Sequence, residues 1–251
     1  MAQFYMNLPS NASLKTYPKN TLASYTTHLP STVQLNGQWE VALVEVSYPR
    51  TWYNITAGQC YATIHDKRDN TATVVHIPEG YYHNVEEILS ILNDAFHESR
   101  NVTNASFNSR SRKVSFGLTS TMTIILNKSL ADILGFEQLE MCGPSYALSA
   151  TAGDINRGCN TLFVYCDVAE DVIVGDTKAP LLRTVNVEGE YGDTVHKIYS
   201  TPLYVPVRKS HFDTIEINIR DETGQLVPFT FGRTIVTLHF RRVGSILFPP
   251  R

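Results

Sequence analysis

The chain is poor in the residues and motifs that mark redox, metal and membrane proteins. It has only four cysteines, which form no Cys-x-x-Cys pair and lie at no metal-ligand spacing from a histidine, so we expect buried or unreactive thiols. Its longest dense apolar run, residues 41–44, is far too short to cross a bilayer. Because the first residues also lack the basic start and apolar stretch of a signal peptide, we expect a soluble protein that has no membrane span and is not secreted.

The sequence also lacks the motifs of the common enzyme classes. It contains no Gly-x-Ser-x-Gly, Walker-type, Gly-x-Gly-x-x-Gly, His-Glu-x-x-His or EF-hand pattern. The eight histidines are dispersed, and even His239, which shares a strand face with Arg241, has no neighbouring nucleophile or paired acid. The acidic residues Glu170, Asp171 and Asp176 match no calcium-binding loop and are typical of a solvated turn. We therefore predict no catalytic residue, no cofactor and no metal site.

Charge is sparse and slightly negative. Charged residues make up 18% of the chain, and the formal net charge is −3. A dedicated nucleic-acid-binding protein needs a clear positive excess to contact phosphates, so this class is disfavoured. Hydrophobic residues make up 43%, which is enough to bury a core and argues against a disordered chain.

What the sequence does contain is a series of alternating strands, clearest over residues 212–242. Two sets of three apolar residues alternate there with polar ones: Ile215, Ile217 and Ile219, then Val236, Leu238 and Phe240. Alternation with a period of two buries one face of a strand, and a slip of one residue would expose the whole set. With residues 221–224 as a turn, the pattern predicts a hairpin.

The remaining patterns predict the fold class. Further strands are indicated over residues 39–49, 113–118, 122–126, 161–168, 180–187 and 196–207, and residues 59–77 are predicted to form a hairpin with its tip at residues 67–70. Asn84 and Glu87 mark a capped amphipathic helix, while Ser129 and Gly135 mark a short helical turn; residues 142–159 are typical of a long surface loop. Roughly eight to ten strands without βαβ alternation predict an all-β protein, a single jelly-roll β-sandwich with one or two short helices inserted between strands.

We expect two parts along the chain. Residues 1–30 combine scattered apolar anchors with prolines, which suits an extended N-terminal arm, and residues 31–251 are expected to form a single jelly-roll domain with a C-terminal tail. Neither the arm nor the apolar tail is expected to remain free in an assembly. The possible assembly contacts are Phe4, Tyr5, Leu8, Ile246, Leu247 and Phe248.

Short segments along almost the whole chain resemble the penton-type minor capsid protein of Polinton (Maverick) elements and the related adintoviruses. The resemblance depends on their order and spacing more than on any one of them. The segments are Leu8-Pro9-Ser10-Asn11, Tyr17-Pro18-Lys19-Asn20-Thr21, Leu29-Pro30, Leu35-Asn36-Gly37-Gln38-Trp39-Glu40-Val41-Ala42-Leu43, Tyr48-Pro49, Ile77-Pro78-Glu79-Gly80-Tyr81-Tyr82, Leu134-Gly135-Phe136 and the closing residues 217–242.

The resemblance implies a structural virion protein with a single jelly roll. Proteins of this family are expected to stand as homopentamers at the fivefold vertices of an icosahedral capsid whose faces are built by a double jelly-roll major capsid protein. It therefore implies assembly inside the host cell, a place in the virion and no enzymatic activity. The chain lacks Arg-Gly-Asp, so receptor binding through that sequence is not implied. A jelly-roll carbohydrate- or ligand-binding module is the alternative, because the fold alone does not separate the two roles.

Overall fold

The computed structural model describes residues 2–98, 104–155 and 159–244. The chain forms two compact units, each with its own buried core: unit 1 comprises residues 1–52 and 158–251, and unit 2 comprises residues 53–157. The sequence predicts one domain over residues 31–251, and the structure corrects this because the inserted residues 53–157 close a core of their own. Strands alternate in the same way in both units, so no change of pattern marks the boundary.

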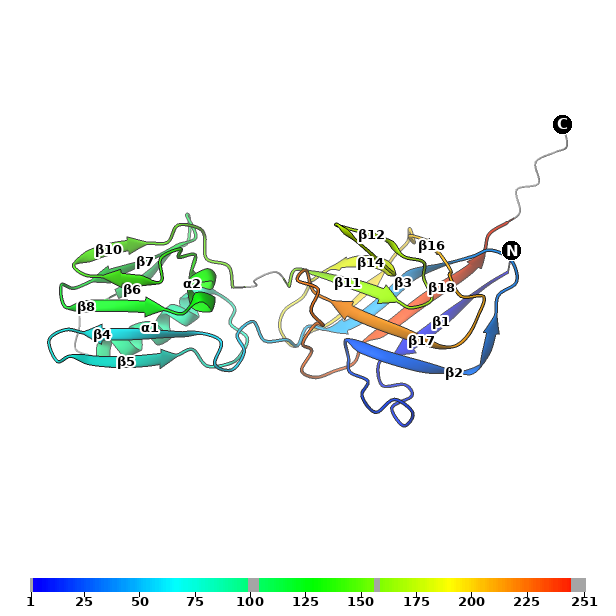
Figure 1. Ribbon diagram of the computed structural model, residues 1–251, viewed down its shortest axis with the longest axis horizontal. Coiled ribbons are helices and arrows are strands. Elements are labelled where there is room, and N and C mark those ends of the chain that lie inside the picture. Colours follow the sequence, from blue (N-terminus) through cyan, green and yellow to red (C-terminus); the bar gives the residue numbers. More distant parts are fainter. Residues whose placement is uncertain (1, 99–103, 156–158, 245–251) are drawn as a thin grey trace, which may run out of the picture. The chain divides into compact units, whose positions relative to one another are not determined.

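Unit 1 is a sandwich of two antiparallel sheets (Figure 1). Its strands in chain order are β1 Gln3–Pro9, β2 Ser24–Gln34, β3 Trp39–Pro49, β11 Thr161–Cys166, β12 Val172–Val174, β13 Thr177–Ala179, β14 Leu181–Asn186, β15 Thr194–Ile198, β16 Val205–Pro206, β17 His211–Arg220 and β18 Ile235–Arg242. One sheet has the order β1-β18-β3-β15, with β16 also paired to β3, and the other has the order β14-β11-β17-β2. Strands β12 and β13 form a separate ribbon.

The apolar faces of the two sheets make the core of unit 1. The three isoleucines of β17 and the three apolar residues that alternate in β18 are all fully buried, which confirms the predicted inward faces. The predicted hairpin is wrong, because β17 pairs with β11 and β2 while β18 pairs with β1 and β3. Residues 221–234 therefore connect opposite sheets. Strand alternation sets which face is buried, but it does not choose the partner strand.

The predicted N-terminal arm is also corrected. β1 pairs with β18 over seven positions, from Gln3 opposite Arg241 to Pro9 opposite Ile235, and β2 already begins at Ser24. Period-two alternation turns the apolar residues of β1 toward the core, and Leu8 is only 2% exposed. The proline of this strand stands at its end, where it interrupts no ladder. The segment is part of the sandwich.

Unit 2 combines two small antiparallel sheets with two helices (Figure 1). Its elements are β4 Tyr61–Asp66, β5 Thr71–His76, α1 Val85–Glu98, β6 Asn104–Asn108, β7 Lys113–Leu118, β8 Met122–Leu126, α2 Lys128–Leu134, β9 Glu140–Cys142 and β10 Ser145–Leu148. The sheet orders are β5-β4-β8-β9 and β10-β7-β6. The predicted hairpin around residues 67–70 is confirmed as β4 and β5, whereas the predicted loop over residues 142–159 contains β10, which pairs with β7.

The two helices begin and end at polar caps. The backbone N–H of Glu87 donates to Asn84 Oδ1 at 3.0 Å, and the Glu87 carboxylate accepts from the backbone of His83 at 3.1 Å, so the predicted cap of α1 is confirmed. The cap of α2 is Asn127, not Ser129, because Asn127 Oδ1 accepts from the backbone N–H of Leu130 at 3.2 Å. Gly135 ends α2 at φ 81°, as predicted.

Candidate functional site

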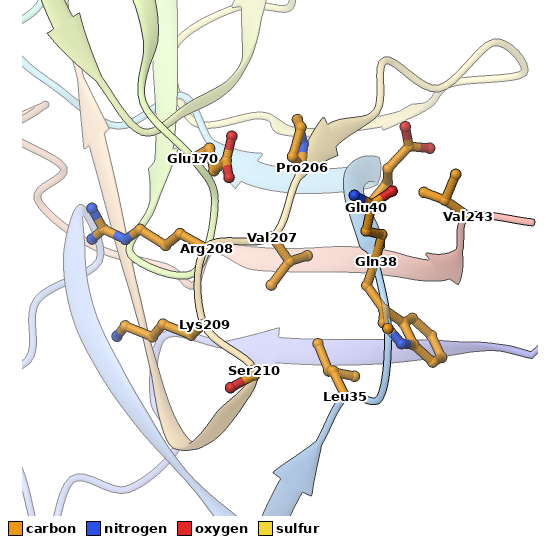
Figure 2. A pocket seen from close by; sticks show the side chains of 12 residues that line it. Leu35, Gln38, Glu40, Glu170, Pro206, Val207, Arg208, Lys209, Ser210 and Val243 are labelled. Atoms are coloured by element: carbon orange, nitrogen blue, oxygen red, sulfur yellow. The ribbon is translucent and has the colours of Figure 1, made fainter. Parts of the chain in front are cut away.

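A hollow lies at one end of unit 1 (Figure 2). It has a volume of about 460 Å³, and we call it the end pocket. It lies between the β2–β3 turn, the connection from β16 to β17 and the last residues after β18. Its walls are made by Leu35, Gly37, Gln38, Trp39, Glu40, Glu170, Pro206, Val207, Arg208, Lys209, Ser210 and Val243.

Backbone hydrogen bonds hold the apolar wall of the end pocket in place. Val207 donates to the carbonyl of Trp39 at 2.9 Å, and Leu35 donates to the carbonyl of Ser210 at 2.7 Å. The Trp39 indole N–H donates to the carbonyl of Asn36 at 3.1 Å, which leaves the indole ring to form part of the wall. The pocket is thus preformed by segments that are distant in the sequence.

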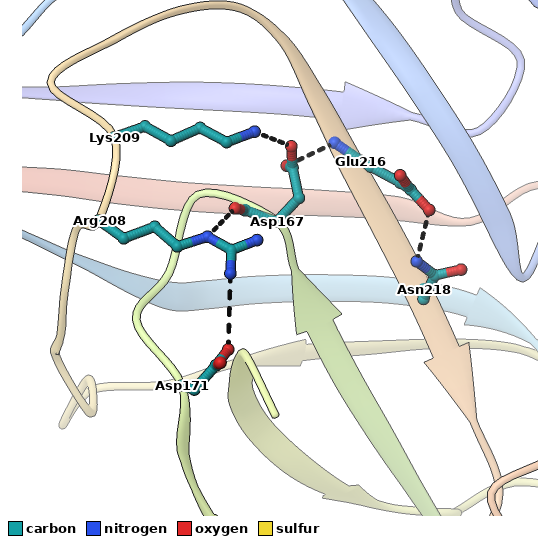
Figure 3. Close-up of polar contacts among 6 residues, drawn as sticks. All are labelled: Asp167, Asp171, Arg208, Lys209, Glu216 and Asn218. Atoms are coloured by element: carbon teal, nitrogen blue, oxygen red, sulfur yellow. Dashed lines mark hydrogen bonds and ion pairs between the residues drawn. The ribbon is translucent and has the colours of Figure 1, made fainter. Parts of the chain in front are cut away.

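The cationic side chains beside the end pocket are paired (Figure 3). Lys209 Nζ lies 2.5 Å from Asp167 Oδ2, and Arg208 donates from Nε to the Asp167 carbonyl at 2.7 Å. Arg208 also lies 3.6 Å from the carboxylate of Asp171. The other carboxylate oxygen of Asp167 accepts from the backbone N–H of Glu216 at 2.8 Å. Asp167 therefore ties the end of β11 to β17 and to the connection before it.

A second feature of unit 1 is the outer face of the β1-β18-β3-β15 sheet. Tyr5 stacks on His239 with ring centroids 4.3 Å apart, and the hydroxyl of Tyr204 lies 2.7 Å from His239 Nδ1. Arg241 lies over the ring of Tyr204 and is held by both its Nε and Nη2 against Glu40, at 2.9 and 2.8 Å. Burial lowers the pKa of His239, and the charge of Arg241 lowers it further. The imidazole is therefore neutral at physiological pH.

This outer face also exposes large apolar side chains. Ile198 at the end of β15 is 73% exposed, and Tyr5 is 63% exposed. Together with Tyr199 and Tyr204, both line a shallow depression of about 390 Å³. Contiguous apolar patches on a protein surface mark interaction sites more often than single exposed residues do.

Within the described ranges, no group of three or more His, Cys, Asp or Glu side chains could hold a metal ion. Cys60 and Cys166 are buried and Cys142 is exposed. Burial raises the pKa of Cys159 and of Cys166 to about 12, so these two thiols are protonated and poorly nucleophilic.

The structure separates the residues that the sequence nominates for assembly. Phe4 stacks on Phe240 at 4.9 Å and Leu8 is buried, so both belong to the core of their own subunit, whereas Tyr5 faces outward. The tail residues Ile246, Leu247 and Phe248 lie outside the described residues. Sequence reasoning missed the end pocket, because its walls come from four separate segments that only the paired sheets bring together.

Comparison with solved structures shows the same fold in two virophage proteins. The crystal structure of the mavirus penton protein matches with a TM-score of 0.55 and 13% sequence identity, over 96% of this chain and 100% of that chain. A chain from the cryo-EM structure of the Sputnik virophage matches with a TM-score of 0.50 and 10% identity, over 95% of this chain and 97% of that chain. No protein-family model and no curated protein sequence matches the chain.

Both units of the chain are included in these matches, because almost the whole of each chain is aligned. No described helix is long and apolar enough to span a membrane. The predicted fold class is confirmed: the chain is a single jelly-roll β-sandwich, with two helices in the segment inserted between its strands.

Proposed function

We propose that the chain is a penton, a minor capsid protein that forms homopentamers at the fivefold vertices of an icosahedral capsid. The observation that carries this proposal is the likeness to the mavirus penton protein over the full length of that protein. The inserted unit 2 is included in the match, and a generic likeness between sandwiches would not extend to it. This also favours a capsid role over the carbohydrate- or ligand-binding alternative.

The outer face of unit 1 supports an assembled state. Tyr5 and Ile198 are both exposed and line the same shallow depression, which suits a contact with another protein surface. In a ring, each subunit presents one surface to a different surface of its neighbour, so such a patch is covered by a heterologous contact. We propose that Tyr5 contributes to these contacts, and that a double jelly-roll major capsid protein surrounds the ring in the virion. We therefore propose that the chain has a structural role and is not an enzyme.

Electron microscopy of the purified protein, alone and with the major capsid protein, tests the proposal. We expect fivefold rings and a solution mass five times that of the chain. Ile198→Asp should reduce the ring fraction without unfolding the subunit, because it places a charge on the outer face and removes no buried side chain. A stable dimer, or capsids with no density for this chain at their vertices, would refute the role.

Binding to an array of glycans is the control for the alternative function. A defined sugar specificity from a monomeric subunit would favour the ligand-binding module, whereas rings without sugar binding would favour the penton.

A further inference from the structure

We propose that His239 is an acid-sensitive switch on the outer face of unit 1. While its imidazole is neutral, it holds the side chains of Tyr5 and Tyr204 over the sheet, and protonation of the imidazole releases both. The stacking, the hydrogen bonding and the burial around this ring carry the proposal, which concerns the single subunit and stands apart from the capsid role.

The sheet is shielded from solvent where His239 lies. Ala42 of β3 stands opposite His239 of β18 in the strand register. Because Val41 and Leu43 on either side of it belong to the core of unit 1, alternation turns Ala42 to the outer face, yet Ala42 is fully buried. His239 itself is only 6% exposed. Side chains on the outer face therefore cover this part of the sheet.

Two tyrosines enclose the imidazole. Tyr5 of β1 stacks on it, with ring planes 16° apart and ring centroids 4.3 Å apart. Tyr204, which comes just before β16, places its hydroxyl 2.7 Å from Nδ1. The Arg241 guanidinium lies 3.4 Å from the centroid of the Tyr204 ring and adds a cation–π contact. The two tyrosines come from distant parts of the sequence, and His239 is the residue that both contact.

The acids on this face are engaged by other groups. The charged and titratable side chains around the imidazole are Tyr5 from β1, Glu40 and Glu45 from β3, His196 from β15, Tyr199 and Tyr204 from the connection after it, and Arg241 from β18. Glu40 accepts from Arg241 at 2.9 and 2.8 Å. Glu45 accepts from the Thr237 hydroxyl at 3.1 Å and lies 2.9 Å from His196 Nε2. Neither carboxylate is therefore placed to neutralise a protonated His239.

The enclosed site accommodates the neutral imidazole better than the cation. Nε2 is buried and has no hydrogen-bond partner among the residues that the structure describes. In the cation both nitrogens carry a proton, so Nε2 would hold a charged and unpaired N–H within the field of Arg241. Burial, and then the charge of Arg241, accordingly lower the pKa of His239. Water can solvate the cation once the two tyrosines move away.

Acid therefore favours the released arrangement. Below the pKa of the enclosed imidazole, each further pH unit favours release by about tenfold, because the released arrangement binds one more proton. This range lies below the ordinary histidine value of about 6.5. Tyr5, Tyr204 and His239 all line the depression of about 390 Å³, so release also removes the depression. In the proposed ring, which uses Tyr5, acid should then reduce the ring fraction, and this consequence alone rests on the proposed function.

A thiol under the covering side chains measures the release. Ala42→Cys is introduced into full-length protein that carries Cys142→Ser and Cys159→Ser, which removes the two cysteines that are not buried. Labelling with a pyridyl disulfide is followed at about pH 7.5 and about pH 5, where ordinary carboxyl groups remain largely ionised. Each rate is divided by that of the urea-unfolded protein at the same pH. We expect the corrected rate of the introduced thiol to rise by about tenfold or more in acid.

Three controls identify the group and the extent of the opening. His239→Gln should abolish the pH dependence, because an amide does not titrate in this range. His196→Gln is the matched control, since it changes a histidine of the same sheet that pairs with Glu45, and it should leave the dependence unchanged. Cys166, buried in the core of unit 1, should stay unlabelled at both pH values. Equal corrected rates at the two pH values, a dependence that survives His239→Gln, or simultaneous labelling of Cys166 would each overturn the switch.

Proton NMR of the natural sequence repeats the test without the added sulfur. The ring protons of His239, identified by their absence in the His239→Gln spectrum, should be displaced upfield at about pH 7.5 by the stacked ring of Tyr5. They should return to ordinary values as the imidazole titrates, and a displacement that persists through the titration would overturn the switch. Mass measurement at both pH values separates the two proposals: a pH-dependent thiol in a protein that forms no ring supports the switch and refutes the penton.

Discussion

Replacing Leu8 by alanine tests whether residues 3–9 belong to the core of unit 1. The side chain of Leu8 is 2% exposed and packs in the unit 1 core, and its carbonyl accepts a hydrogen bond from the buried hydroxyl of Tyr25 at 2.9 Å. The change removes three carbons, worth about 2.4 kcal/mol at 0.8 kcal/mol for each buried CH₂ group. The cavity that remains raises the loss in free energy of unfolding to about 3–5 kcal/mol.

Tryptophan fluorescence is a suitable assay because Trp39 and Trp52 both lie in unit 1. Urea unfolding followed in this way reports the stability of unit 1 without the contribution of unit 2. For a unit of this size, each kcal/mol lowers the melting temperature by about 2–4 °C, so we expect Leu8→Ala to lower it by roughly 6–20 °C. Gln3→Ala, on the exposed side of the same strand, is the matched control and should have an effect within about 0.5 kcal/mol.

A loss of less than about 1 kcal/mol in the Leu8 variant would refute the reasoning, because surface substitutions have effects of that size. Residues 1–30 would then act as the separable arm that the sequence suggests. A large loss would instead show that deletion of this segment unfolds the sandwich, and that any contribution to assembly is confined to its outward side chains.

Three further measurements follow from single contacts. Tyr25→Phe removes the hydrogen bond that the hydroxyl donates to the Leu8 carbonyl, and should lower the free energy of unfolding of unit 1 by about 0.5–1.5 kcal/mol in urea; no loss would contradict the expected contribution of this bond. Because the pKa of His239 is lowered in the folded state, the unfolded chain binds more protons, so stability should fall as pH drops through and below about 6.5. His239→Gln should flatten this dependence of stability on pH. An equal slope in the variant would show that His239 is not the group responsible. In unit 2, Asn127→Ala should lower the free energy of unfolding, followed by circular dichroism, by about 1–2 kcal/mol, because it removes the cap of α2. Ser129→Ala should have little effect, and the reverse order would restore Ser129 as the cap.

Local patterns in the sequence determined much of the secondary structure. The strand predicted over residues 39–49 is β3, those over 113–118 and 122–126 are β7 and β8, and the cap of α1 follows from Asn84 and Glu87. These features depend on neighbours within a few residues, either through period-two burial or through a side chain that reaches the next turn of backbone. The fold class followed from the number and spacing of such strands.

Only the tertiary structure decided which strands pair and which surfaces result. Alternation in residues 212–242 fixed the inward faces of β17 and β18, yet the two strands joined opposite sheets, because the partner of a strand is chosen by packing across the whole core. The same reason explains why β1 belongs to the sandwich, why residues 53–157 form a separate unit and why four distant segments enclose the end pocket. A sequence determines locally which face of a strand is apolar, whereas the global fold determines what covers that face.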